Sequence, residues 1–291
     1  MKFIHISPTA HLNDFCNKQK DHLILAHLVE SDPKYRQWYQ TKRRSDPGVN
    51  FILDNSAFEM YKQGKPMYPA SKLIEMGKEV GANYIVMPDY PGSHGEKTER
   101  AALEYGPEFK DAGFGTFFCP QSRVGDSEND IQEYQLLESF RWAASQKFID
   151  YVGFSCLAIP NAYGVEKGNN LQRFMARHKF IKKLERMGIL DYMKLMGKKL
   201  HLLGMVDGPN EISLLGPWLH KFTSWDSSAA VWAGLNNIKF DNSPTGLVDG
   251  KLELHVDFGA KVEDTHSMQI ARENVYTISR LILDNTQGGS R

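Results

Sequence analysis

Cysteine is scarce in this chain, and its few copies are far apart. The 291 residues include three cysteines, Cys16, Cys119 and Cys156. An odd number at this spacing fits neither a disulfide framework nor the paired cysteines of a zinc cluster. We therefore expect the three thiols to be small buried hydrophobic groups, and the sequence predicts no metal site.

Long apolar runs and an excess of charge of one sign are missing as well. No segment approaches the roughly 20 consecutive apolar residues that a bilayer span needs. The opening segment, residues 1–8, has the pattern of a strand and lacks the apolar core of a signal peptide. Lysine and arginine together number 35, as do aspartate and glutamate. These features predict a cytoplasmic protein without a membrane segment.

Apolar runs that end in polar residues alternate with helical patterns along most of the chain. Hydrophobic residues make up 41% of it, which is enough for a core and excludes a disordered chain. Continuously apolar strands separated by helices are typical of a parallel sheet covered by helices. We expect strands near residues 3–7, 51–56, 84–89, 116–121, 151–156, 200–205 and 222–226. We expect helices near 70–80, 96–112, 128–146, 170–187, 211–219 and 229–235.

This alternation predicts an α/β protein, and at this length it favours a (β/α)8 TIM barrel. No G-x-G-x-x-G follows the first strand, which argues against a doubly wound dinucleotide-binding sheet. The pattern identifies seven strands and does not place an eighth. We expect a single domain over 1–291, with a hairpin or extended excursion at 237–264 and a C-terminal helix at 265–284.

Polar residues finish most of the expected strands. In a (β/α)8 barrel the functional side chains lie at the carboxyl ends of the strands. One such residue alone could be a turn former or a helix cap: Asp54 could form an Asx turn, and Asp226 could be an N-cap. Several carboxylates around one pocket are typical of a nucleophile, a general base or a hydrogen-bond acceptor. The residues at these ends are Asp54, Asp89, Gln121, Ser155, Gly204 and Asp226.

Two basic runs stand out against the neutral net charge. Residues 34–44 hold five bases and no acid, with three aromatic residues between them, and 171–200 hold nine bases against two acids. Such a run is usually a solvated helix face, but with interleaved aromatics it also suits a phosphate backbone and unstacked bases. The candidate nucleic-acid-binding residues are Lys42, Arg43, Arg44, Arg173, Arg177, Lys182, Lys183, Lys198 and Lys199. None of the ten histidines has metal-ligand spacing, and we expect structural or surface roles for all of them.

Six short segments resemble, in the same order, motifs of the queuine/archaeosine tRNA-guanine transglycosylases. Asp54-Asn55-Ser56-Ala57-Phe58-Glu59 is similar to the family's Asp-Ser-Gly-Gly-Phe/Tyr-Gln. The other segments are Met87-Pro88-Asp89, Cys119-Pro120-Gln121-Ser122, Ser155-Cys156-Leu157-Ala158, His201-Leu202-Leu203-Gly204-Met205-Val206-Asp207 and Trp225-Asp226-Ser227-Ser228. The similarity extends over residues 51–233, roughly three fifths of the chain.

The family's zinc site near the C terminus has no counterpart, because no cysteine follows Cys156. A short chain of this kind is more similar to the phage and bacterial branch that inserts 7-deazaguanines into DNA. The resemblance therefore implies a TIM barrel lacking the zinc subdomain, with double-stranded DNA and a 7-deazaguanine such as preQ0 as substrates and without a cofactor. It also implies a monomer, and the host cytoplasm as its location if a phage encodes it.

The resemblance further implies a role for each matched residue. Asp226 corresponds to the nucleophile that traps the sugar, and Asp54 to the general base. The implied base-binding residues are Phe58, Asp89, Gln121, Ser155, Cys156, Leu157, Leu203, Gly204 and Met205. Three alternatives stay open: the same exchange on tRNA, a glycosylase that releases guanine to water, and a catalytically inactive nucleic-acid-binding barrel.

Overall fold

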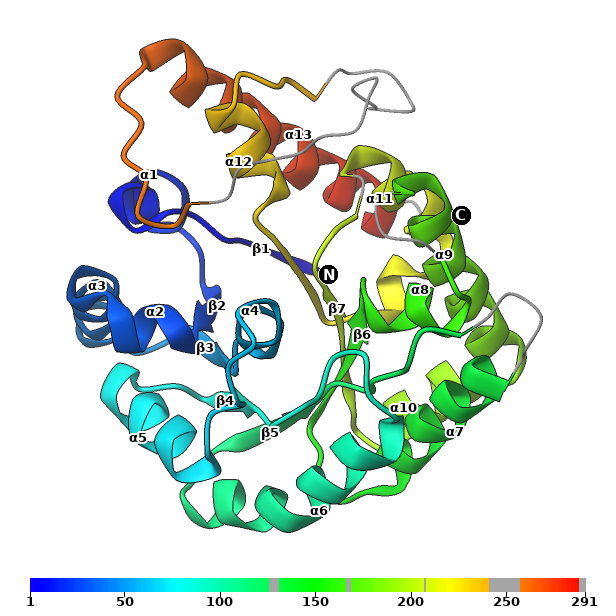
Figure 1. The fold of residues 1–291 in the computed structure, drawn as a ribbon. Helices are drawn as coiled ribbons and strands as arrows, with labels where there is room; N and C mark the ends of the chain where they lie inside the picture. Colours follow the sequence, from blue (N-terminus) through cyan, green and yellow to red (C-terminus); the bar gives the residue numbers. More distant parts are fainter. Residues whose placement is uncertain (126–130, 166–168, 207, 241–256, 288–291) are drawn as a thin grey trace.

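Eight parallel strands alternate with helices and form a nearly closed barrel, which confirms the predicted (β/α)8 fold (Figure 1). The computed structural model describes residues 1–125, 131–165, 169–206, 208–240 and 257–287. The strand order in the sheet is β1-β8-β7-β6-β5-β4-β3-β2. The strands are β1 (Lys2–His5), β2 (Asp21–Leu25), β3 (Asn50–Asp54), β4 (Tyr84–Val86), β5 (Gly115–Phe118), β6 (Tyr151–Ser155), β7 (Lys199–Leu203) and β8 (Ser224–Ser227).

The helices surround the barrel, and most lie where the sequence pattern predicts them. The first six are α1 (Leu12–Phe15), α2 (Ala26–Ser31), α3 (Pro33–Ser45), α4 (Ala57–Lys62), α5 (Ala70–Val80) and α6 (Gly95–Asp111). The others are α7 (Ile131–Ser145), α8 (Ala158–Ala162), α9 (Asn170–Arg186), α10 (Ile189–Leu195), α11 (Pro209–Leu215), α12 (Ala229–Leu235) and α13 (Thr265–Gln287). Two 3-10 helices, η1 (Thr9–His11) and η2 (Gly216–Lys221), complete the set of described helices.

The predicted helix 211–219 is wrong in one respect, because it is divided between α11 and η2. The expected start of another helix, at 128–130, and most of the expected hairpin, at 241–256, lie outside the described residues. The C-terminal helix begins at Thr265 as predicted and ends at Gln287, packing along α12 and α11 (Figure 1). Within the described part of the chain, no helix combines the length and apolar character needed to cross a bilayer.

The strand that the sequence pattern did not place is β2. Its five residues are all buried, and it pairs in parallel with β3 so that Leu25 lies beside Asp54. The apolar pattern of this strand continues without a turn into α2, which begins at Ala26. The periodicity of such a short apolar run does not distinguish a strand from the start of a helix.

Aromatic side chains fill the barrel between β5, β6 and β7. Phe117 stacks on Tyr151 with ring centroids 5.4 Å apart and meets the ring of His201 edge-on at the same distance. Gly153 leaves room for this packing, since a Cβ atom there would lie 2.6 Å from the side chains of both Phe117 and Leu203. The interior packing therefore fixes the ring of His201, which lies directly beneath the carboxyl ends of the strands.

The seam between β1 and β2 is closed by a side chain, since these two strands end the sheet order. The amide of Gln19, just before β2, accepts from the backbone N–H of His5 at 2.7 Å and donates to its carbonyl oxygen at 3.0 Å. The thiol of Cys16 donates to the same carbonyl at 3.2 Å. Gln19 thus provides for the last residue of β1 the two bonds that a neighbouring strand would otherwise supply.

We expect Gln19→Ala to lower the free energy of unfolding by about 1–2 kcal/mol, because the buried backbone N–H of His5 loses its acceptor. Urea denaturation followed by circular dichroism measures the change. Gln135→Ala, at an exposed position on α7, is the matched control and is expected to stay within about 0.5 kcal/mol of wild type. Equal effects of the two substitutions would contradict a role for Gln19 at the seam.

Candidate functional site

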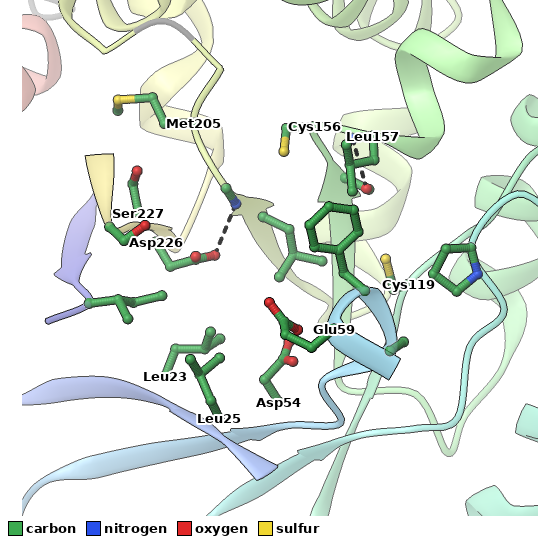
Figure 2. Close-up of a pocket in the computed structure, with 18 of the residues that line it drawn as sticks. Leu23, Leu25, Asp54, Glu59, Cys119, Cys156, Leu157, Met205, Asp226 and Ser227 are labelled. Carbon is green, nitrogen blue, oxygen red and sulfur yellow. Dashed lines mark hydrogen bonds between the residues drawn. The ribbon is translucent and has the colours of Figure 1, made fainter. Parts of the chain in front are cut away.

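A cavity of about 620 Å³ opens at the carboxyl ends of the strands (Figure 2). Its volume lies within the range of roughly 300–1,000 Å³ that is usual for small-molecule sites. The strand-end and base-binding residues expected from the sequence come together here. Those that line the cavity are Asp54, Phe58, Asp89, Gln121, Ser155, Cys156, Leu157, Leu203, Gly204, Met205 and Asp226.

Asp226 is held at the end of β8 by two donors on one oxygen. Its Oδ1 accepts from His201 Nε2 at 2.9 Å. The same oxygen accepts from the backbone N–H of Gly204 at 3.2 Å, the bond drawn as a dashed line at Asp226 in Figure 2. The other ring nitrogen of His201, Nδ1, lies 2.7 Å from Ser224 Oγ. When the serine hydroxyl donates to Nδ1, Nε2 carries the proton and donates to the carboxylate, so all three groups are satisfied. Because both bonds fall on Oδ1, the second oxygen of Asp226 stays available to an electrophile.

His201 is a site residue that the sequence analysis missed, because it assigned structural or surface roles to every histidine. The ring is fully buried inside an apolar strand. In the sheet register it lies beside Ser224, the residue to which it bonds. A polar residue in the middle of a buried strand was the available signal, but its partners on β8 become visible only in the fold.

Asp54 stands at a strained turn between β3 and α4. Its Oδ1 accepts the backbone N–H of Ser56 at 2.7 Å, so the predicted Asx turn and the predicted pocket position are both present. Ser56 adopts the left-handed region with φ 56°, a conformation that costs a non-glycine residue on the order of 1 kcal/mol. Its hydroxyl contacts His27 at the backbone N–H (3.1 Å) and at Nδ1 (2.9 Å), and these bonds hold the turn.

Glu59 adds a further carboxylate to the cavity wall beside Asp54 (Figure 2). Burial raises the pKa of Asp54 well above its usual value, and the negative charges of Glu59, Asp89 and Asp226 raise it further. Burial also raises the pKa of Glu59, with a smaller opposing effect from Lys62. The sequence analysis quoted Glu59 within a motif but assigned it no role.

Asp89 is fixed between two side-chain amides. Asn55 Nδ2 donates to its Oδ1 at 2.6 Å, and Gln121 Nε2 donates to its Oδ2. Burial raises the pKa of Asp89 to about 6 even though both donors favour the ionised form. Each carboxylate oxygen keeps a lone pair for a ligand, whereas the amide nitrogen of Gln121 is already committed to Asp89.

The prediction that Arg177 contacts nucleic acid is wrong, because this side chain is not at the surface. Its side chain is fully buried, and Nη1 donates to the carbonyl of Gly204 at 2.8 Å and to Glu211 Oε1 at 3.1 Å. The arginine therefore braces the loop after β7 from below. Arg173, one turn earlier on α9, does line the cavity and donates to the carbonyl of Cys156 at 3.0 Å.

The other predicted contacts lie away from the cavity. Lys198 is buried and donates to two backbone carbonyls, so its assignment to a nucleic-acid surface is also wrong. Lys199 and Arg43 bond to groups at the amino ends of strands, Tyr84 for the lysine and Val49 and Asn83 for the arginine. Lys42 and Arg44 flank Arg43 on α3, and Lys182 and Lys183 are exposed on α9 about 14 Å along the helix from Arg173.

The charges around the cavity have a simple arrangement. Four carboxylates line it, those of Asp54, Glu59, Asp89 and Asp226, whereas Lys62 and Arg173 are the lysine and arginine in the described lining. Lys62 Nζ stands 4.4 Å above the ring of Phe58. The interior is therefore acidic and carries two flanking cations.

No model of a known protein family matches the chain, and no curated protein matches it significantly. In the part of the chain that the structure describes, no group of three or more His, Cys, Asp or Glu side chains is arranged to hold a metal ion.

We expect Arg177→Met to lower the free energy of unfolding by about 3–5 kcal/mol, because Glu211 would keep a buried charge without this cation. Chemical denaturation measures the loss. Lys182→Met, at an exposed position on the same helix, is expected to change the stability by less than about 0.5 kcal/mol. An Arg177→Met protein as stable as wild type would contradict the bracing role of this arginine.

Proposed function

We propose that the protein replaces guanine in DNA with a 7-deazaguanine base through a covalent link between Asp226 and the deoxyribose. The observation that carries this proposal is the pairing of two different carboxylates in one cavity. Asp226 is oriented by His201 and Gly204 through a single oxygen, and Asp54 is a buried carboxylate with a raised pKa. A nucleophile and a proton-transferring group require these two environments.

The proposed reaction has two displacement steps at C1′ of the sugar. A carboxylate oxygen of Asp226 bonds to C1′ while the bond from C1′ to guanine breaks, as in retaining glycosidases. The electron pair of the broken bond goes to N9 of guanine, which takes up a proton as the base leaves. The incoming 7-deazaguanine then bonds to C1′ through N9, and the bond to Asp226 breaks. The N9 proton of the incoming base goes to Asp54, which acts as the general base.

The charges around the cavity favour a nucleotide whose sugar and base lie inside the cavity and whose phosphates lie outside it. Positive charge develops on the sugar as the glycosidic bond breaks, and the ionised carboxylates of the lining stabilise it. The same carboxylates repel phosphate groups. We assign to Lys62 and Arg173 the contacts with the phosphates of a flipped nucleotide, whose removal from the stack costs a few kcal/mol.

Recognition of the base is assigned to Asp89. Its two carboxylate oxygens, each held by an amide, suit the adjacent N1–H and 2-amino donors of guanine and of 7-deazaguanines. Adenine lacks both donors, so this carboxylate discriminates against it. Leu203, Gly204 and Met205 would supply the wall against the ring.

Incubation with duplex DNA and preQ0 is expected to place a 7-deaza-2′-deoxyguanosine in the DNA, detected by mass after digestion to nucleosides. Asp226→Ala is expected to lower the exchange by more than about 10³-fold, because the nucleophile is lost. Asp191→Ala removes an exposed aspartate on α10 and is the matched control with wild-type exchange.

Other outcomes of this assay identify the alternatives. Product in tRNA alone would move the exchange to tRNA, and abasic sites without incorporation would identify a glycosylase. Nucleic-acid binding by wild type and Asp226→Ala with no exchange by either would identify an inactive binding barrel. Each of these results would overturn the proposed reaction on DNA.

Binding of the free base is expected to depend on the ionisation of Asp89, whose pKa is about 6. Below that pH a proton occupies the acceptor that the base needs, so affinity falls about tenfold per pH unit, whereas above pH 7 it is constant. Calorimetric titration of preQ0 between pH 5 and 8 measures this. Asp89→Asn is expected to bind weakly and without the pH dependence, whereas Asp54→Asn keeps it. A flat profile in the wild type would contradict the role of Asp89.

A further inference from the structure

Glu59 is a buried carboxylate in the cavity to which the proposed reaction gives no task. It lies in the first turn of α4, directly after the strained turn that begins at Asp54. Glu59 and Asp54 both line the cavity, where their side chains are drawn beside one another (Figure 2), and the charge of Glu59 acts on Asp54. The turn between β3 and α4 therefore presents two acids as a pair.

Such a pair cannot easily carry two negative charges, because burial and mutual repulsion both favour the neutral form of one member. The backbone N–H of Ser56 supports charge on Asp54, but it contacts only Oδ1. The negative charges of Asp226 on β8 and Asp89 after β4 raise the pKa of Asp54 further. Asp226 also raises the pKa of Glu59, whereas Lys62 on α4 lowers it.

Four other titratable groups line the same cavity, and two of them, Cys119 and Cys156, are thiols whose pKa is raised by burial. Burial lowers the pKa of His27 on α2 to about 4, so this ring is neutral near pH 7. Arg173 on α9 is held by the carbonyl of Cys156. The charge of Lys62 lowers the pKa of Glu59, and the negative charge of Asp226 raises it.

We propose that Asp54 and Glu59 hold one proton between them while Asp226 is ionised, and release it to the departing guanine as Asp226 becomes an ester. This inference rests on the proposed base exchange. It makes Glu59 a positioning residue, which keeps Asp54 protonated until the moment of transfer. The charge of Asp226 raises the pKa of both acids, and esterification removes that charge.

The proton balance closes over the two steps. In the first step Asp226 loses its charge by bonding to C1′, and the shared proton moves to guanine, so the base leaves as a neutral molecule. Both members of the pair are then ionised. In the second step the N9 proton of the incoming base returns to the pair as N9 bonds to C1′, and Asp226 leaves as a carboxylate. The cycle consumes no proton and needs no further reactant.

Carboxyl ¹³C NMR of the protein without nucleic acid tests the sharing directly. In wild type, Asp54 and Glu59 are expected to titrate in two coupled steps, the upper of which lies well above the usual range of a carboxyl group. Asp226→Asn reproduces the charge lost on esterification, and it is expected to shift the upper step down by about one pH unit or more. Independent titrations, or an upper step that Asp226→Asn leaves unmoved, would overturn the proposal.

The pH profile of exchange tests the same proton during catalysis. Exchange in wild type is expected to fall at alkaline pH once the shared proton is lost. Glu59→Gln keeps the volume but removes the repelling charge, so its alkaline fall is expected at a pH lower by about one unit or more. Glu96→Gln, an exposed glutamate on α6, is the matched control and keeps the wild-type profile.

The two measurements separate failure of this inference from failure of the proposed function. Exchange with identical profiles for wild type and Glu59→Gln would overturn the role of Glu59 and leave the base exchange standing. A shared proton in the NMR titration with no exchange on any nucleic acid would overturn the proposed reaction, and with it the transfer to guanine. Thermal unfolding of Glu59→Gln checks that the fold is retained.

Discussion

The hydrogen bond from His201 to Asp226 is the interaction on which the site depends. It transmits the packing of the barrel interior to the cavity, since the ring of His201 rests against Phe117 and is oriented by Ser224. Gly153 permits that packing by leaving space between β5 and β7. The position of the reactive carboxylate is therefore set by strands, which hold a side chain more rigidly than loops do.

The loop after β7 is also held by hydrogen bonds to buried side chains. The N–H of Gly204 donates to Asp226, while its carbonyl accepts from Arg177 at 2.8 Å and from the indole of Trp225 at 2.7 Å. The N–H of Val206 donates to Glu211 Oε2 at 2.8 Å. The buried ion pair of Arg177 and Glu211 thus supports the backbone that forms one wall of the cavity.

Sequence patterns predicted the barrel and the strand-end residues because both follow from short-range signals. Apolar runs with polar ends identify strands, and parallel strands bring their carboxyl ends to one edge. Residues whose role depends on distant partners were not predictable in this way. His201 needs Ser224 and Asp226 on the next strand, and Arg177 needs Glu211 on another helix. Arg177 and Lys198 were wrongly predicted as surface contacts because charge along the sequence does not indicate which residues are buried.

The arrangement of β1 has a consequence for the order in which the chain folds. This strand pairs with β8, which comes late in the described chain, and it meets β2 through side chains, among them Gln19 and the ion pair of Lys2 with Asp21. During synthesis the first strand emerges long before its ladder partner exists, so its backbone groups stay unpaired while the sheet grows from β2 onward. Contacts of such long sequence separation form slowly, because the chain loses the entropy of loop closure before the new contacts stabilise it. We therefore expect β1 to join the sheet late in folding, and until it does the unpaired edges of β2 and β8 favour aggregation of the nascent protein.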